Sequence, residues 1–314
     1  MKNNQYKPLV SVIMPVYNAG DFLVEAIESI LQQTFRDFEL IIVDDKSTDQ
    51  SWKIISKYQK KYPSIIKALR TEKTMNRGGD SCANEALKLA QGKYIARMDA
   101  DDISHPTRFQ KQVEFLEKNS EYFLVGSNAY VINKTGKIIG AKKEPLKHND
   151  IFKSYFTFHP IIHPSAMYHR IIDSKSFFYP KKFSANNDYY AFFELIANGK
   201  QFANLEEKLI YYRIHGHNNT FINMKKNFSN TLKIRLIMVN KYNYSPTIKQ
   251  WLICLMQLAT FTILPEKILT NIYLLSRGII KPEQSINKVI NKIRNIFPRK
   301  NHNLLLKSRF RPLS

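Results

Sequence analysis

Short apolar runs and longer amphipathic segments alternate along the first 120 residues. The apolar runs at 9–14 and 38–43 predict strands buried on both faces of a sheet, and those at 65–69 and 94–98 predict further strands, the one at 65–69 with the weaker pattern. The amphipathic segments predict helices at 22–33, about 48–62, 79–91 and 106–118. Pro106 is a typical first helical residue, and Gly92 a typical residue just past a helix end. This alternation predicts an α/β fold with a doubly wound, mostly parallel sheet and flanking helices.

The pattern changes after residue 120. An alternating stretch with a Thr135-Gly136 turn predicts a hairpin, and further strands and one helix are expected at 122–144, 163–169, 188–198 and 209–214. Beyond Phe221 the chain is helical, basic and rich in leucine. We therefore expect one catalytic-type domain over 1–221, with halves of about 8–105 and 106–221, and a basic helical C-terminal region over 222–314.

Polar clusters follow three of the predicted strands. They are Pro15 to Asn18, Asp44-Asp45 and Asp99 to Asp102. Ligands of doubly wound sheets bind at the carboxyl ends of the strands, so these clusters are expected to lie together.

The Asp99 to Asp102 cluster indicates a metal site. Carboxylates at the end of an apolar strand repel one another, and a hard cation such as Mn²⁺ or Mg²⁺ would relieve the repulsion and hold a diphosphate on its other side. The alternative is a solvated acidic turn, which the cluster alone does not exclude.

The order of several motifs adds a family resemblance. The motifs are Val10-Ser-Val-Ile-Met-Pro-Val-Tyr-Asn18, Ser29 to Thr34, Phe38 to Asp45, Ser47-Thr-Asp49, Asn76-Arg-Gly78, Ala83-Asn84, Ala90 to Ile95 and Asp99-Ala-Asp-Asp102. Together they resemble glycosyltransferase family 2, whose members have the GT-A fold. The resemblance covers roughly residues 8 to 220, and the combination is specific although each motif alone is not.

The resemblance implies roles by position. A nucleotide pocket would be lined by Pro15, Tyr17 and Asn18, by Asp45 at the uracil edge with Asp44 beside it, and by Asn76 and Arg77. Asp99 would face the ribose or the metal, and Asp101 would bind the metal. A plain turn at the strand end is the alternative for Tyr17 and Asn18.

The resemblance also implies a catalytic base. Family members carry a Glu-Asp pair that opens a helix, and here Asn187 stands in place of Glu while Asp188 matches the base. A carboxylate at a helix N-terminus stays ionised and can accept the proton of an acceptor hydroxyl. A simple helix cap is the alternative. His215 is a further candidate metal or phosphate ligand, and His163 lies in a stretch that resembles the border of the acceptor pocket.

Charge and composition limit the partners and the cellular location expected for this chain. The net charge is +22, and from Met224 onward seventeen lysine and arginine residues stand against Glu266 and Glu283. Such a segment attracts anionic lipid, phosphorylated substrates or nucleic acid. The apolar run Trp251–Leu264 would rise only about 21 Å as a helix, too short to span a bilayer, so docking in the membrane interface or packing on the domain remain as alternatives.

We therefore expect an inverting enzyme that transfers one sugar from a nucleotide sugar, most simply UDP-linked, to a glycan acceptor, lipid-diphosphate-linked if the tail docks on a membrane. Assembly of capsule, exopolysaccharide or lipopolysaccharide would use such an enzyme. Two cysteines without a disulfide framework and a polar N-terminus fit a cytoplasmic protein, peripheral on the inner face of the cell membrane. A processive synthase lacks support, since neither spanning helices nor a Gln-x-x-Arg-Trp motif occurs. A nucleotidyltransferase and a basic nucleic-acid-binding protein are the rival classes, although no nucleic-acid-binding module is visible and we expect no such partner.

Overall fold

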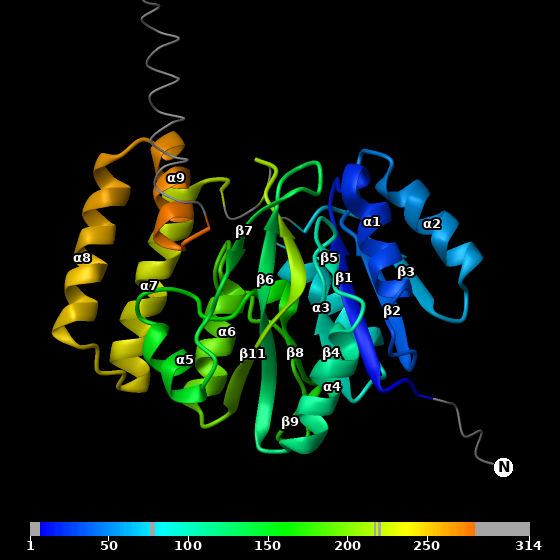
Figure 1. Cartoon of the computed structure of the whole chain (residues 1–314), viewed down its shortest axis with the longest axis horizontal. Helices are drawn as coiled ribbons and strands as arrows, with labels where there is room; N and C mark the ends of the chain where they lie inside the picture. Colours follow the sequence, from blue (N-terminus) through cyan, green and yellow to red (C-terminus); the bar gives the residue numbers. More distant parts are fainter. Residues whose placement is uncertain (1–6, 76–78, 217, 219–220, 280–314) are drawn as a thin grey trace, which may run out of the picture.

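The structure, a computed structural model, describes residues 7–75, 79–216, 218 and 221–279. A twisted nine-stranded sheet runs through the centre of the molecule, with helices on both faces (Figure 1). The strand order is β3-β2-β1-β4-β8-β6-β11-β5, and β7 pairs with the C-terminal part of β6. Segments that are far apart in the sequence therefore share one sheet.

The first half of the sheet is parallel throughout. It consists of β1 (Val10–Val16), β2 (Phe38–Asp44), β3 (Ile66–Arg70) and β4 (Tyr94–Arg97). Every residue of β1, β2 and β4 is buried, which explains their continuous apolar runs.

Helices cover both faces of these strands. One face packs against α1 (Gly20–Leu31), α2 (Ser51–Lys61) and α4 (Arg108–Lys118), and the other against α3 (Asp80–Leu89). Alternate residues of β1 divide between the two cores, with Val12 and Met14 on the first face and Ile13 on the second.

The second half of the sheet is mixed. Strand β8 (Met167–His169) runs antiparallel between β4 and β6 (Tyr122–Ile132), and β11 (Gln201–Arg213) is parallel to β6. The expected strand at 209–214 is thus the end of a 13-residue strand. The remaining elements are β5 (Ile103–Ser104), β7 (Ile138–Lys142), α5 (His148–Ser154), a short 3₁₀ turn η1 (His163–Ser165), the β9–β10 ribbon (Ile171–Ile172 and Lys175–Ser176) and α6 (Asn187–Ala197).

Two local expectations were wrong. Helix α3 ends at Leu89 and does not use Gly92 as its left-handed cap. Gly92 instead lies against β1, where a Cβ atom would come within 2.6 Å of the Ser11 backbone nitrogen, so close backbone approach explains this glycine. Helix α4 begins at Arg108, two residues after Pro106, and Thr107 is its N-cap residue.

The described part of the C-terminal region, up to residue 279, forms three helices at one edge of the molecule. They are α7 (Met224–Tyr242), α8 (Ile248–Ile263) and α9 (Glu266–Ser276), and α8 lies outermost (Figure 1). Ile234 and Met238 of α7 belong to the same core as α3, α5 and α6. The boundary expected near Phe221 falls between β11 and α7, but α7 is packed on the catalytic-type domain. Among the described helices, none is long and apolar enough to cross a membrane.

Candidate active site

Three carboxylates gather where β4 ends. Oxygen atoms of Asp99, Asp101 and Asp102 all lie within 4.8 Å of one another. One oxygen of Asp102 is buried and has no hydrogen-bond partner. An all-oxygen donor set with an unsatisfied carboxylate oxygen suits a hard divalent cation such as Mg²⁺ or Mn²⁺. The predicted metal site therefore fits the residues present.

The end of β11 holds this acidic loop in place. The backbone N–H of Arg213 donates to Asp102 Oδ1 over 2.8 Å, and its buried guanidinium donates from Nε to the Asp101 carbonyl over 2.7 Å. His215 Nε2 lies 2.8 Å from Asp101 Oδ2, and the Asn218 side chain donates to the same oxygen over 3.3 Å. The structure thus brings the predicted ligands Asp101 and His215 together, although they are far apart in sequence.

The electrostatics of the cluster favour cation binding. Burial and the neighbouring Asp101 charge raise the pKa of Asp99, although Arg97 opposes this. Burial and the charges of Asp101 and Asp99 raise the pKa of Asp102 well above its usual value. A carboxylate cluster that resists ionisation is one that a cation would stabilise.

Arg97 and Asp80 are buried ionisable side chains near this loop. Arg97 Nη2 donates to Asp99 Oδ1 over 2.8 Å, while its Nε and Nη1 have no hydrogen-bond partner. Gly79, with φ of 84°, passes above the guanidinium, and a Cβ there would lie 3.4 Å from Nη2. Burial and the Asp188 charge raise the pKa of Asp80 well above its usual value. Arg97 is therefore a buried positive centre that interacts with the carboxyl groups of Asp99 and Asp80.

The predicted nucleotide pocket begins at the end of β1. Tyr17 is 55% exposed, and Asn18 adopts a left-handed φ of 49°. The Asn18 carboxamide oxygen accepts from the Thr48 backbone N–H over 2.9 Å, and the Asn18 N–H donates to Ser47 Oγ. Asn18 therefore ties the loops after β1 and β2 together, while Tyr17 is open to a ligand. Pro15 lies inside β1, paired with Val43, and contributes its carbon atoms beneath Gly79.

Asp44 ends β2 and Asp45 follows it, and both side chains are buried. Asp44 is fully buried, and its carboxylate pairs with Arg70 at 3.1 Å and accepts from the Ser47 N–H, so it holds the loop. Asp45 Oδ1 accepts the Met75 N–H over 2.7 Å, which fixes the chain just before the Asn-Arg-Gly motif. Direct contact of either residue with a nucleotide stays a prediction. Asn76 and Arg77 lie outside the described residues.

Asp188 stands in the first turn of α6, as predicted. Its Oδ2 lies 3.4 Å from His159 Nε2 and 3.6 Å from His163 Nδ1. Burial alone would raise the pKa of Asp188, but His163, His159 and the Tyr189 backbone N–H together hold it well below its usual range. The side chain is therefore ionised at neutral pH, as a general base must be.

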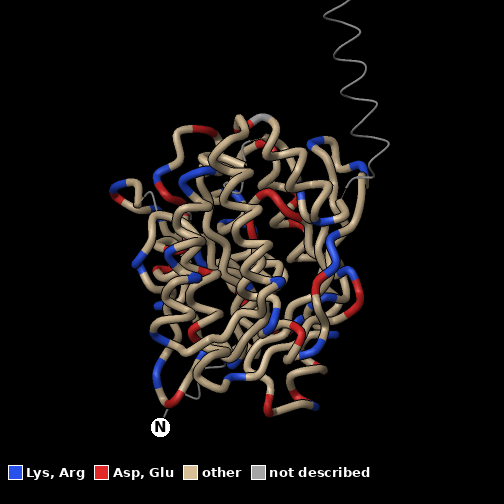
Figure 2. Tube along the Cα trace, turned by 90° about the vertical axis from the view of Figure 1, so that its left-hand side faces the viewer, with Lys and Arg blue, Asp and Glu red and all other residues tan. Residues whose placement is uncertain are grey.

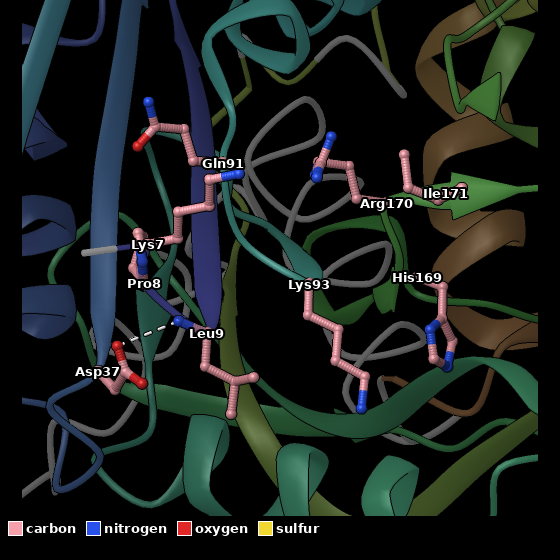
Figure 3. A pocket seen from close by; sticks show the side chains of 9 residues that line it. All are labelled: Lys7, Pro8, Leu9, Asp37, Gln91, Lys93, His169, Arg170 and Ile171. Carbon is pink, nitrogen blue, oxygen red and sulfur yellow. Dashed lines mark hydrogen bonds between the residues drawn. The ribbon is translucent and has the colours of Figure 1, made fainter. Parts of the chain in front are cut away.

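An open hollow of about 450 Å³ lies at the opposite end of the sheet (Figure 3). Leu9 and Lys93 immediately precede β1 and β4, whereas the acidic loop follows β4. The hollow is lined by Lys7, Pro8, Leu9, Asp37, Gln91, Lys93, His169, Arg170 and Ile171. Since it is remote from the acidic loop and from Asp188, it does not belong to the candidate site.

Four buried or half-buried residues of the site were not predicted from the sequence. They are Asp80, Arg97, His159 and Arg213. Arg97 could have been predicted from the sequence, because a charged residue inside an otherwise apolar strand needs a buried partner. The others act through contacts with residues distant in sequence.

Comparison with known proteins fits this geometry. The family model Glycosyl transferase family 2 matches residues 11–177, more than half of the chain. An uncharacterized glycosyltransferase of Methanocaldococcus jannaschii is 40% identical over 70% of this chain and 76% of its own length. The chain therefore belongs to glycosyltransferase family 2 and is a sugar-transferring enzyme, which sets aside nucleotidyl transfer and a purely nucleic-acid-binding role.

Two further proteins bear on the details. A UDP-Glc:alpha-D-GlcNAc-diphosphoundecaprenol beta-1,3-glucosyltransferase of Escherichia coli is 31% identical over 66% of this chain and 78% of its own length. The crystal structure of S. aureus TarS 1-349 in complex with UDP-GlcNAc is 21% identical, with a TM-score of 0.60 over 75% of this chain and 67% of that one. The latter likeness confirms the GT-A fold.

Proposed function

We propose that this enzyme transfers one sugar from a UDP-sugar, with inversion, to a hydroxyl of a lipid-diphosphate-linked glycan in cell-surface polysaccharide biosynthesis. The main observation in support is that the site contains two groups of carboxylates whose neighbours shift their pKa values in opposite directions. Asp99, Asp101 and Asp102 form a crowded cluster, whereas Asp188 stands apart on α6 between two imidazoles. One group suits a cation and a leaving diphosphate, the other an attacking hydroxyl.

On the leaving side, Asp99, Asp101 and Asp102 would hold a divalent cation, with His215 orienting Asp101. When bound, such an ion supplies charge neutralisation to the departing diphosphate. Arg213 keeps the loop in shape, through its bonds to Asp101 and Asp102. Tyr17, exposed beside the loop after β1, would contact the nucleotide.

On the attacking side, the Asp188 carboxylate accepts the proton of the acceptor hydroxyl while that oxygen bonds to the anomeric carbon. The bond from the anomeric carbon to the diphosphate oxygen breaks at the same time, and UDP leaves. Attack from the face opposite the leaving group inverts the anomeric configuration. The arrangement needs no covalent intermediate, because base and leaving group occupy different sides of the sugar.

UDP as the nucleotide is supported by the two proteins above, one named for UDP-Glc and one solved with UDP-GlcNAc. The diphosphate-linked lipid acceptor is supported by the name of the E. coli relative. A donor panel tests the first point. We expect UDP-sugars to be consumed and the product linkage, measured by proton coupling at the anomeric centre, to be inverted. Turnover of GDP- or CMP-sugars alone, or retention of configuration, would contradict the proposal.

A lipid-linked acceptor requires access to a membrane, and the outer face of α8 offers a docking surface. Large apolar side chains on this helix are exposed, namely Ile248 (82%), Leu252 (56%), Leu255 (58%), Met256 (61%) and Ile263 (75%). Their spacing places them along one side of the helix, opposite buried Cys254. Figure 2 views the molecule from the side on which α8 lies.

Charge favours an anionic lipid surface as the occupant of this face. Residues 224–263 contain no aspartate or glutamate, and besides buried Arg235 they contain five exposed lysines, namely Lys225, Lys226, Lys233, Lys241 and Lys249. Basic side chains near an anionic membrane each contribute about 1 kcal/mol of attraction, and exposed apolar side chains add insertion into the headgroup region. We propose that the enzyme docks on the inner face of the cell membrane through α8.

Vesicle flotation tests the docking. The full-length chain should float with anionic vesicles and dissociate at high salt, whereas a double variant, Leu252→Glu with Leu255→Glu, should stay in solution. Val24→Glu on α1, an exposed apolar position on another side of the molecule, is the matched control. Donor hydrolysis should be unchanged in both variants. Flotation of the double variant like the wild type, or loss of an oligomer in place of membrane binding, would overturn the proposal.

A further inference from the structure

Two histidines flank the Asp188 carboxylate, and the chemistry proposed above assigns them no task. His159 follows α5 and His163 opens η1, so both come from the segment that leads into β8. Both rings approach the same oxygen, Oδ2, at 3.4 Å and 3.6 Å. These separations are longer than those of formed hydrogen bonds, as is common in an enzyme without its substrates.

The proton of His159 is fixed by its backbone. His159 Nδ1 accepts the N–H of Ile161 over 3.3 Å, so in the neutral ring the proton is on Nε2. Nε2 is buried and has no formed hydrogen bond, and the Asp188 carboxylate is its neighbour at 3.4 Å. Within the described part of the chain, the Asp188 carboxylate is therefore the acceptor to which this N–H is directed.

The proton of His163 is placed by two tyrosines. His163 Nε2 lies 2.9 Å from the Tyr179 hydroxyl, which lies 3.1 Å from the Tyr168 hydroxyl. Burial lowers the pKa of His163 to about 3, so the ring is neutral and carries one proton. A carboxylate only accepts, so the favourable arrangement has Tyr179 donating to Nε2 and Nδ1–H directed at Asp188.

We infer that His159 and His163 are positioning residues, which clamp Asp188 Oδ2 with two imidazole N–H groups and so present Oδ1 to the acceptor hydroxyl. The inference rests on the proposed role of Asp188 as the base. A carboxylate held by one oxygen is restrained in rotation, and its other oxygen takes the proton from a defined direction. A displacement of about 1 Å in such a geometry costs about 10²-fold in rate.

Amide isosteres separate the N–H groups from the ring as a whole. His159→Gln places an amide N–H where Nε2 stood, and His163→Asn places one where Nδ1 stood. We expect both to retain most of the wild-type kcat, whereas His159→Leu and His163→Leu lower kcat by about 10²-fold. His169→Leu on β8, a histidine packed against Tyr94, is the matched control. Donor affinity, measured with UDP, should be equal in all five variants.

The pH profile supplies a second readout, which a purely structural role would not move. The imidazoles lower the pKa of Asp188, while burial raises it. Asp80 of α3 and Asp99 of the acidic loop also interact with Asp188, and a negative charge on either carboxyl opposes its ionisation. Loss of either N–H should therefore move the acidic limb of kcat to higher pH, and the amide variants should restore it.

The outcomes are distinct. If the leucine variants fold and turn over at the wild-type rate while Asp188→Asn is inactive, the clamp is wrong and the base assignment stands. If the amide variants fold but are as slow as the leucine variants, the N–H groups are not what matters, and the clamp is again wrong. If Asp188→Asn itself is active, the proposed base is wrong.

Discussion

Asp99 and Asp188 are both half-buried aspartates that face the same site, yet their surroundings act in opposite directions. Asp99 has Asp101 and Asp102 as neighbours, and its pKa is raised. Asp188 has His159 and His163 as neighbours, and its pKa is lowered. The side chain is the same, so its neighbours decide whether the carboxylate suits binding a cation or accepting a proton.

The difference assigns the two halves of the reaction. A cluster of like charges is stabilised when a cation binds, so the acidic loop suits the diphosphate side. A single carboxylate with N–H neighbours is ionised without help, so it suits the side of the attacking hydroxyl. Arg97 interacts with Asp99 and Asp80, so its positive charge offsets part of the negative charge on the side of the acidic loop.

The largest effect is expected at the single carboxylate. Asp188→Asn should cut transfer by about 10²–10⁴-fold, because an amide cannot take the acceptor proton. UDP affinity should not change, since Asp188 is not among the acidic-loop residues. Single-turnover transfer and calorimetric titration measure the two quantities, with the exposed Asp173→Asn as control. A near-normal transfer rate would remove Asp188 from the chemistry.

The acidic loop should show the reverse pattern. Asp101→Ala should abolish the metal-dependent part of UDP binding, a loss of at least about 10²-fold, because a ligand contributes more than the 10–100-fold of its outer partners. The fold should survive, since Arg213 holds the Asp101 carbonyl rather than its side chain. Titration of UDP with and without Mn²⁺ measures this, with Asp21→Ala as an exposed control. Equal affinities for variant and wild type would take the cation out of the mechanism.

A smaller effect is expected at His215, which contacts the predicted metal ligand Asp101. His215→Ala should weaken Mn²⁺-dependent UDP binding by about 10-fold, because the histidine orients Asp101 from 2.8 Å. His215→Gln should recover part of the loss, since its amide N–H reaches a similar place. The same titration decides the matter, and full affinity in the alanine variant would show that His215 has no part in the cation site.

The smallest effect concerns stability. The pKa of Asp80 is raised in the folded state by burial and by Asp188, so the folded chain binds a proton that the unfolded chain releases above about pH 4. The free energy of unfolding therefore falls as pH rises from about 4 toward the raised pKa of folded Asp80. Asp80→Asn should raise Tm at neutral pH by about 2–4 °C. Thermal melts at pH 4.5 and 7.5 test this. A variant that melts lower than the wild type at pH 7.5 would show that the Asp80 charge is stabilising.

Local pattern was sufficient for much of the fold. The strands β1, β2 and β4 are continuous apolar runs because both their faces are covered, and the helices between them have one apolar side. The acidic loop was visible for the same reason, since its carboxylates are adjacent in sequence and follow a recognisable strand. Gly92 shows the limit, because a glycine after a helix has two uses, and only the distance to Ser11 decides between them.

The sequence by itself therefore determined the class of sheet, the family and the two carboxylate groups, all of which rest on neighbouring residues. Tertiary structure alone decided what surrounds those carboxylates, since His159 and His163 reach Asp188 only when α5, η1 and α6 pack together. It also decided which side of α8 is exposed. That helix is apolar around most of its circumference, so only its packing against α7 and α9 leaves Leu252 and Leu255 facing outward. Contacts between distant segments depend on the whole fold, and the local pattern of apolar and polar residues does not predict them.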